Sequence, residues 1–113
     1  MRGIMHTQLK AGYKILKTAE FQGWLNRLPA KSKSIVLARL DMLAIGHFGD
    51  HKRFDGLFEL RWMNGTRLYG FFWQSSVVVV LYGGDKNGQR RDIKKAKRIR
   101  EEVLDGTRSL HKP

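Results

Sequence analysis

The sequence contains no cysteine and no long apolar run. Without cysteine there is no disulfide framework, no thiol nucleophile and no cysteine-based zinc site. Since nothing in the chain requires an oxidising compartment, we expect a cytoplasmic protein. The longest apolar run, residues 77–82, is far shorter than the ~18 residues of a membrane-spanning helix, so no membrane partner is predicted.

Acidic residues are scarce as well. Ten Asp and Glu stand against 22 Lys and Arg, which leaves a formal net charge of +12. This balance indicates an anionic partner such as nucleic acid, an acidic protein segment or an anionic membrane, although a basic surface can also serve solubility alone. The densest basic stretch is residues 86–100, where Asp92 is the one acidic residue.

The length of 113 residues suits one domain with one core, and a hydrophobic fraction of 42% is typical of a folded chain. Residues 1–12 are mixed polar, lack the apolar core of a signal peptide, and are expected to be a flexible leader. The single domain is expected over residues 13–105, followed by a polar tail over residues 106–113.

The first half of the domain predicts a strand and two helices. Residues 13–17 are a short strand, after which Thr18 can cap a helix that Pro29 ends. The apolar face of that helix recurs at i, i+3, i+4 and i+7: Phe21, Trp24, Leu25 and Leu28. A second helix is predicted over residues 32–45, with Gly46 as its C′ residue. Its apolar stripe is Val36, Leu40 and Leu43. The short break between the two helices predicts an antiparallel helical hairpin.

The second half predicts a loop, three strands and a helix. Gly, Asp and His dominate residues 47–56, which are expected to be a loop. Strands follow over residues 58–62, 67–73 and 77–82, and the last of these has no polar alternation and should be buried on both faces. The final helix, residues 89–104, has an apolar stripe opposite a Lys and Arg face: Ile93, Ala96, Ile99 and Val103. The class is therefore α+β in the order β-α-α-β-β-β-α, with an antiparallel sheet, the helical hairpin on one face and a basic C-terminal helix.

The turn at Asn64-Gly65 leaves two registers open for the next strand. A two-residue turn would pair Trp62 with Arg67 and bury the guanidinium, whereas a three-residue bulged turn would pair Arg61 with Tyr69. Because burying a lone guanidinium is costly, we favour the bulged register. One sheet face would then be open to solvent and carry Glu59, Arg61, Arg67 and Tyr69, with Lys86 near its end and Lys52 in the preceding loop. These charges suit phosphate contacts, with Tyr69 stacking on a base, although they could also be ion pairs of Glu59 with Arg61 or Arg67, each of which contributes little.

Two other patterns are weaker. The four histidines are scattered at positions 6, 47, 51 and 111, which disfavours a metal site, although His47 or His51 could serve as a base. Gly83-Gly84-Asp85-Lys86 lies between a strand and a helix but lacks the spacing of a phosphate-binding loop, so no nucleotide cofactor is predicted. The glycines favour a turn that places Lys86 at the end of the sheet.

The ordered set of these motifs resembles the HigB-like addiction-module killer proteins of the RelE/ParE toxin superfamily. The helical motifs are Phe21-x-x-Trp24-Leu25-x-x-Leu28 and Arg39-Leu40-x-x-Leu43-x-x-Gly46-x-Phe48-Gly49-Asp50-x-Lys52. The strand and C-terminal motifs are Phe58-Glu59-Leu60-Arg61, Gly65-x-Arg67-x-Tyr69 and Gly83-Gly84-Asp85-Lys86-x-x-Gln89-x-x-Asp92-Ile93-x-x-Ala96. The resemblance covers residues 13–103 and implies a RelE-like fold.

The resemblance also implies the toxin of a type II toxin–antitoxin pair: a metal-independent, cofactor-free endoribonuclease that cuts mRNA, often on the ribosome. Arg61, Arg67 and Lys86 match the superfamily's basic positions and are expected to stabilise the scissile phosphate, with Lys52 or Glu59 as the base. The basic helix is expected to hold RNA through Arg90, Arg91, Lys94, Lys95 and Arg98. The implied protein partner is an antitoxin, with a helix-turn-helix domain and acidic contacts.

The chain departs from the family pattern in two places. Some ribonuclease members carry a tyrosine shortly after the Lys86 position, where this chain has Gln89 and Asp92, so no general acid is assigned. The usual Gly-Pro-Gly-Tyr-Arg turn is shortened to Asn64-Gly65-Thr66-Arg67. Two alternatives stay open: a ParE-like toxin that binds DNA gyrase without nuclease activity, and an RNA-binding module without catalysis.

Overall fold

The computed structural model describes residues 12–111, so the expected leader lies almost wholly outside the described residues. The α+β class is confirmed. The elements follow one another in the order β1 (Lys14–Lys17), α2 (Ala19–Arg27), α3 (Ala30–Ala44), β2 (His51–Phe54), β3 (Leu57–Arg61), β4 (Thr66–Gln74), β5 (Val77–Asp85), the 3₁₀ turn η1 (Lys86–Gly88) and α4 (Gln89–Leu104).

A five-stranded sheet in the order β1-β5-β4-β3-β2 forms the centre of the molecule. Strands β2 to β5 pair antiparallel, as predicted for β3 to β5, but β1 joins the edge parallel to β5, which corrects the expected antiparallel sheet to a mixed one. The side chains of residues 78–81 in β5 are fully buried, as predicted for a strand without polar alternation. The two edge strands of the sheet are β1 and β2.

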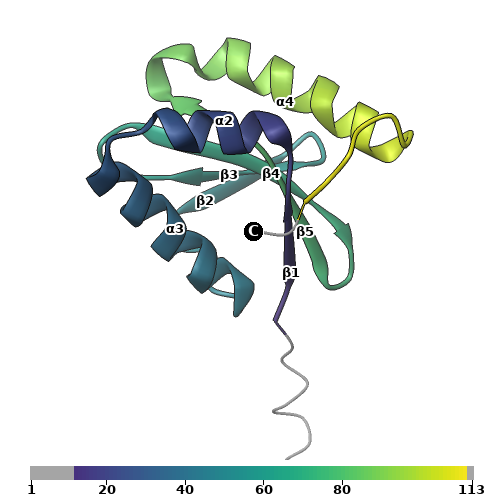
Figure 1. The fold of residues 1–113 in the computed structure, drawn as a ribbon, viewed down its shortest axis with the longest axis horizontal. Helices are drawn as coiled ribbons and strands as arrows, with labels where there is room; N and C mark the ends of the chain where they lie inside the picture. Colours follow the sequence, from purple (N-terminus) through teal and green to yellow (C-terminus); the bar gives the residue numbers. More distant parts are fainter. Residues whose placement is uncertain (1–11, 112–113) are drawn as a thin grey trace, which may run out of the picture.

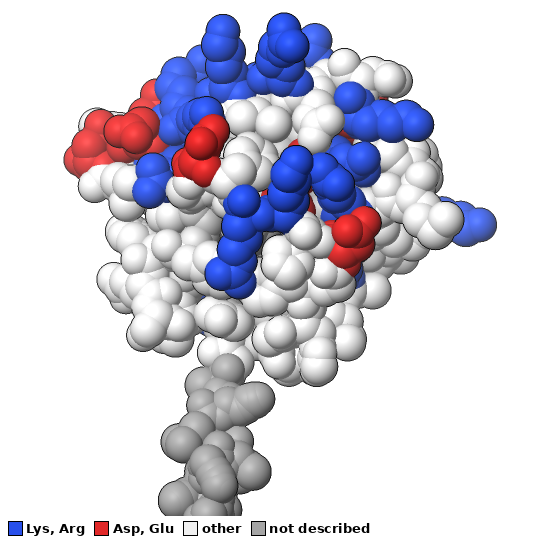
Figure 2. Space-filling view, turned by 180° about the vertical axis from the view of Figure 1, so that it is seen from behind, with Lys and Arg blue, Asp and Glu red and all other residues white. Residues whose placement is uncertain are grey.

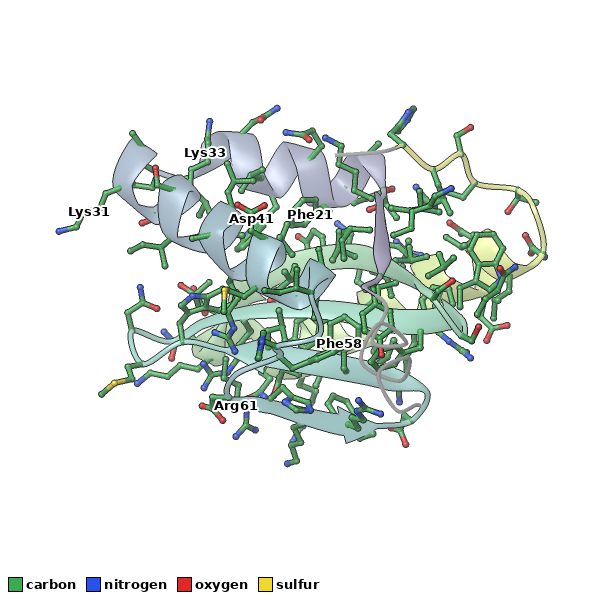
Figure 3. All side chains as sticks on the ribbon, turned by 90° about the horizontal axis from the view of Figure 1, so that it is seen from below. Phe21, Lys31, Lys33, Asp41, Phe58 and Arg61 are labelled. Atoms are coloured by element: carbon green, nitrogen blue, oxygen red, sulfur yellow. The ribbon has the colours of Figure 1, made fainter. Side chains whose placement is uncertain are left out.

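Helices cover both faces of the sheet, which makes three layers (Figure 1). Helices α2 and α3 pack on one face, where Figure 3 shows Phe21 of α2 and Phe58 of β3 in the shared core. Helix α4 packs on the opposite face through Ala96, Ile99 and Val103. Its predicted bounds and apolar stripe are confirmed, because a three-turn amphipathic pattern is a local property of the chain.

Strand β2 corrects the expectation that residues 47–56 form a loop. Residues 51–54 pair antiparallel with residues 57–60, and the turn between them has positive φ at Asp55 (48°) and Gly56 (77°). This is the backbone of a tight two-residue hairpin, for which Asp-Gly is a favoured pair. The strand lacks an apolar pattern because it is an exposed edge, so its stability comes from backbone pairing with β3.

The register between β3 and β4 corrects both registers left open above. Arg61 lies opposite Arg67 and Glu59 opposite Tyr69, so the turn comes one residue earlier in the chain than the predicted bulged turn. It is closed by backbone bonds from Gly65 N to Trp62 O and from Trp62 N to Thr66 O. Since this register differs from the bulged one by two residues, the predicted division of side chains between faces still holds.

Thr18 joins the first helix to the sheet. Its hydroxyl accepts a hydrogen bond from Phe21 N (3.0 Å), as predicted for the N-cap, and donates one to Leu81 O of β5 (2.7 Å). Helix α3 begins two residues earlier than predicted, directly after Pro29. The two helices reverse direction at this link but diverge from it as a V rather than lying side by side as a closed hairpin (Figure 1).

The residues after α4 run back to the start of the domain. Lys17 and His111 exchange two backbone hydrogen bonds of 2.8 and 3.0 Å, and Arg108 forms ion pairs with Glu20 and Glu102. The polar tail is thus tied to β1 and α2. Among residues 12–111, no helix is long and apolar enough to span a membrane.

Candidate RNA-binding and catalytic site

Three cations meet at one end of the sheet, where β3, β4 and β5 lie side by side. Arg61 is the cross-strand partner of Arg67, and Arg67 is in turn the partner of Gly84. Lys86 follows two residues later, and its backbone N–H donates to Gly65 O (2.8 Å) in the β3–β4 connection. The three candidate phosphate ligands from the sequence are therefore brought together by adjacent strands.

A buried carboxylate holds Arg61. Glu59 is fully buried, and its Oε1 accepts from Arg61 Nε at 2.9 Å while its Oε2 accepts from Gln89 Nε2 at 2.6 Å. Burial alone would raise the pKa of Glu59, but the hydrogen bonds from Arg61 and Gln89 outweigh it and keep this pKa below its ordinary value. Glu59 is thus a carboxylate that orients the Arg61 side chain, which is about one-third exposed.

Arg67 and Lys86 are positioned through the β3–β4 connection. Arg67 Nη1 donates to Trp62 O (3.2 Å) and Thr66 O (3.0 Å), while its Nε is buried without a partner among residues 12–111. Gly65 has a positive φ of 99°, and a Cβ placed on it would touch Lys86 Cγ and Cδ at 3.5 Å. The Lys86 stem therefore lies over this glycine, in the connection that leads into β4.

Arg39 is a positioning residue to which the sequence reasoning assigned no role. From α3 it donates to three backbone carbonyls: Phe48 O (2.9 and 3.1 Å), Asp50 O (2.7 Å) and Arg61 O (3.0 Å). Its guanidinium also lies 4.6 Å from the centre of the Trp62 ring. The sequence did contain a signal for this role, because Arg39 stands among the apolar positions of a predicted helix. An arginine at such a position can bind several backbone carbonyls at once, since its guanidinium has several N–H donors.

The face predicted to be open is covered. Helix α4 lies over it, and Tyr69 and Glu59 are both fully buried beneath the helix. The prediction that Tyr69 stacks on a base is therefore wrong, since its ring belongs to the α4 core. The error arose because the charged residues of β3 suggested a face exposed to solvent. In the structure Glu59 and Arg61 neutralise each other, so this face can be buried. The apolar stripe of α4 also requires a surface to pack against.

The remaining candidates lie on the outer surface. Lys52 is exposed on β2 and is the cross-strand partner of Glu59, so it belongs to the α4 side of the sheet. His51, its neighbour, belongs to the opposite side and packs on Phe48, away from Arg61. Within residues 12–111, no three His, Asp or Glu side chains are grouped to hold a metal ion.

Helix α4 carries the largest group of exposed cations. Four of the predicted RNA contacts are exposed on it: Arg90, Arg91, Lys94 and Arg98. Lys95 is half-buried, and its ammonium lies 4.2 Å from the centre of the Tyr82 ring. Figure 2 shows Lys and Arg over the top of the molecule, where α4 lies, and reaching down the face in view. Helix α4 thus adds a basic surface to the cations at the end of the sheet.

Comparison with known proteins places the chain in a family. Residues 23–103 match the model of the phage-derived Gp49-like proteins (DUF891). The chain belongs to the Gp49-like family. The matched residues contain every candidate site residue described above.

Two known proteins illustrate the relationship. A Haemophilus influenzae protein described only as uncharacterized is 39% identical over 94 residues, which cover 80% of this chain and 95% of the relative. A chain in the crystal structure of the toxin–antitoxin complex RelBE2 from Mycobacterium tuberculosis superposes with a TM-score of 0.50 at 21% identity, covering 66% of this chain and 99% of that chain. The second comparison shows that this Gp49-like protein shares the RelE-like fold.

Proposed function

We propose that this Gp49-like protein is the toxin of a type II toxin–antitoxin pair and a metal-independent endoribonuclease that cuts mRNA, on ribosome-bound message. The observation that carries the proposal is the cation cluster, in which Arg61 and Arg67 are direct cross-strand partners and Lys86 lies at the adjoining connection. The shared fold with a chain of a toxin–antitoxin complex supports the same assignment.

The proposed reaction is an internal attack within the RNA. The 2′-oxygen bonds to the neighbouring phosphorus, the bond from phosphorus to the 5′-oxygen breaks, and a 2′,3′-cyclic phosphate remains. A base takes the 2′-hydroxyl proton and an acid returns one to the leaving 5′-oxygen. Two guanidiniums and an ammonium suit this step because negative charge accumulates on the phosphoryl oxygens in the transition state.

The two candidate bases differ in access. Glu59 is fully buried with both oxygens occupied, so its role in this proposal is to orient Arg61. Lys52 is exposed on the same side of the sheet and keeps the role of candidate base. The basic surface of α4 supplies contacts to the RNA backbone or the ribosome, and the same charge suits an acidic antitoxin segment.

Substitution of the cluster tests the proposal. We expect Arg67→Ala and Lys86→Ala each to reduce RNA cleavage by about 100-fold or more and to relieve growth arrest, because each removes a cation from the developing phosphate charge. Lys31→Ala is the matched control, since Lys31 is exposed on α3 and points away from the sheet (Figure 3). Full toxicity in both cluster variants, with wild-type melting temperatures, would refute the assignment.

Mapping of mRNA ends after induced expression separates the proposal from its competitors. New 5′ ends within messages, absent in Lys86→Ala, support cleavage. Intact messages accompanied by DNA damage indicate a gyrase-binding toxin instead. Intact messages with RNA bound to the protein indicate a binding module without catalysis.

A further inference from the structure

A cavity of about 330 Å³ lies at the end of β5, between α2 and α4. Strand β1 pairs with β5 only as far as Val80, so the last residues of β5 continue beyond their edge partner. The cavity lies along this free end and is lined by Trp24, Tyr82, Gly83, Gly84, Arg91 and Asp92, among others. Because Gly84 is the cross-strand partner of Arg67, the cavity adjoins the cation cluster.

Asp92, which lines this cavity, is 4% exposed, and its side chain is 6% exposed. Its nearest cation, Arg91 Nε, is 3.6 Å from Oδ1, which is longer than a hydrogen bond. Burial raises the pKa of Asp92, and the Arg91 charge offsets only part of this effect. The carboxylate is thus almost wholly removed from water with its cation beyond ordinary hydrogen-bond distance, and its burial lowers the stability of the folded state.

Two glycines make room for this carboxylate. A Cβ on Gly84 would lie 2.0 Å from Asp92 Oδ2, and one on Gly88 would lie 3.1 Å from it. The side chain thus lies flat against bare backbone at the wall of the cavity. A ligand with two adjacent N–H groups would complete the hydrogen bonding of the carboxylate.

The surroundings favour a nucleobase over a cation as that ligand. Trp24 and Tyr82 border the cavity, and bases bind preferentially beside aromatic rings. Arg91 lines it, and Arg67 and Lys86 are next to it, so a guanidinium ligand would be repelled while a phosphate-linked base would be attracted. The volume is at the lower end of ligand pockets, which suits a single nucleotide.

Guanine is the base with the matching edge. Its N1–H and N2–H point the same way and can both donate to one carboxylate, whereas adenine and cytosine present an acceptor beside their amino group. We propose that this cavity binds a guanine of single-stranded RNA, with Asp92 accepting from N1–H and N2–H. The proposal rests on the proposed function in that the ligand is RNA, and it names a base preference for the same site.

Nucleotide titration of the intact protein tests the proposal without requiring cleavage. We expect GMP to bind about tenfold or more tightly than AMP, with IMP between them because it keeps N1–H and lacks the 2-amino group. The amide signals of Gly83 and Gly84 and the indole N–H of Trp24, followed by NMR, should shift with GMP. This comparison uses the wild-type protein and stands even if a variant fails to fold.

Asp92→Asn should weaken GMP binding by about tenfold and remove the preference over AMP, because an amide cannot accept two hydrogen bonds in that geometry. Asp41→Asn, the same change on the exposed surface of α3, should bind GMP like the wild type. Equal affinity for GMP, IMP and AMP would overturn the proposal and leave a phosphate site only. Shifts of the same signals by N-acetyl-arginine amide, and not by GMP, would overturn it in favour of a protein ligand.

These outcomes are separate from those of the ribonuclease assay. GMP selectivity together with intact messages would refute the proposed nuclease activity and support the guanine-binding cavity. Cleaved messages together with equal nucleotide affinities would keep the nuclease and refute the pocket.

Discussion

Buried charges in this molecule occur beside the cation cluster, and two carboxylates there have opposite surroundings. Glu59 receives hydrogen bonds from Arg61 and Gln89, whereas the Asp92 carboxylate has Arg91 Nε at 3.6 Å, beyond hydrogen-bond distance. Their pKa values consequently move in opposite directions, down for Glu59 and up for Asp92. The first carboxylate supports the folded state, and the second weakens it.

We expect Glu59→Gln to lower the free energy of unfolding by about 1–3 kcal/mol at pH 7, because Arg61 loses its charged partner. The folded-state pKa of Glu59 is depressed, so its stabilisation is present above the unfolded-state pKa and disappears as the pH falls through the folded-state pKa. Denaturant unfolding from pH 7 to pH 3 should therefore show the two proteins converging in acid. A constant difference would contradict this account, and Glu101→Gln, which alters an exposed carboxylate, is the control.

The same variant tests the positioning role of Glu59. If Glu59 acts by orienting Arg61, Glu59→Gln should lower kcat for RNA cleavage by about tenfold with little change in KM, because the lost contact is to the transition state. An effect confined to KM, or to thermal stability, would show a purely structural role.

Asp92→Asn should act in the opposite direction on stability. A raised folded-state pKa means that the folded state binds protons more readily, so stability falls as the pH rises from the unfolded-state pKa through the folded-state one. The asparagine variant should therefore have a higher melting temperature than the wild type at pH 7, with the difference shrinking in acid. Scanning calorimetry of Asp92→Asn and Asp41→Asn decides the point, and a lower melting temperature for Asp92→Asn alone would refute it.

At the scale of elements, helices are joined to the sheet through single polar side chains. Thr18 joins the start of α2 to Leu81 O, and Arg39 joins α3 to the carbonyls of residues 48, 50 and 61. Gly49, with φ of 65°, lets the Arg39 guanidinium approach, since a Cβ there would lie 3.0 Å from Nε. The segment before β2 and the end of β3 are thus held from α3.

We expect Arg39→Ala to destabilise the fold by about 2–4 kcal/mol, because three backbone carbonyls, two of them in partly buried hydrogen bonds, lose their donor at once. Cleavage should fall as well, since Arg61 O is one of those carbonyls. Arg27→Ala, an exposed change of the same kind on α2, should stay within about 0.5 kcal/mol of the wild type. Urea unfolding measures both, and equal midpoints would contradict the role of Arg39.

The whole molecule carries its charge unevenly over its surface. Exposed Lys and Arg side chains gather on α4, at the top of Figure 2, while the C-terminal end of this helix carries Glu101 and Glu102 and is followed by Asp105. This arrangement suits an RNA that approaches from the start of α4 toward Arg61, Arg67 and Lys86. Binding through so many phosphate contacts depends strongly on salt.

We expect a combined Arg90→Gln, Lys94→Gln and Arg98→Gln variant to reduce the salt dependence of single-stranded RNA binding. The slope of log K against log salt concentration should become shallower by roughly 2, because each lost phosphate contact on single strands contributes about 0.7. The matched triple of Arg27, Lys31 and Lys33, on α2 and α3, should keep the wild-type slope. Fluorescence anisotropy at several salt concentrations measures both, and equal slopes would place RNA elsewhere.

The sequence determined the local elements. Residues 89–104 were predicted as a helix with the correct apolar stripe, Thr18 as a cap, and residues 77–82 as an interior strand, because periodicity, capping and β-branching act over a few neighbouring residues. The motif resemblance also selected Arg61, Arg67 and Lys86, which the fold then places at one end of the sheet. Strand β2 was missed because an exposed edge strand needs no apolar pattern of its own.

Only the tertiary structure decided which surfaces meet. The packing of α4 buries Tyr69 and Glu59 and lets Gln89 donate a hydrogen bond to Glu59. It also brings Asp92 against Gly84 at the edge of a cavity. These contacts join residues far apart in the chain, and their free energy depends on burial and on which hydrogen-bond partners remain available. The sequence shows which residues are charged, but which of them contact one another is decided only when the helices pack on the sheet.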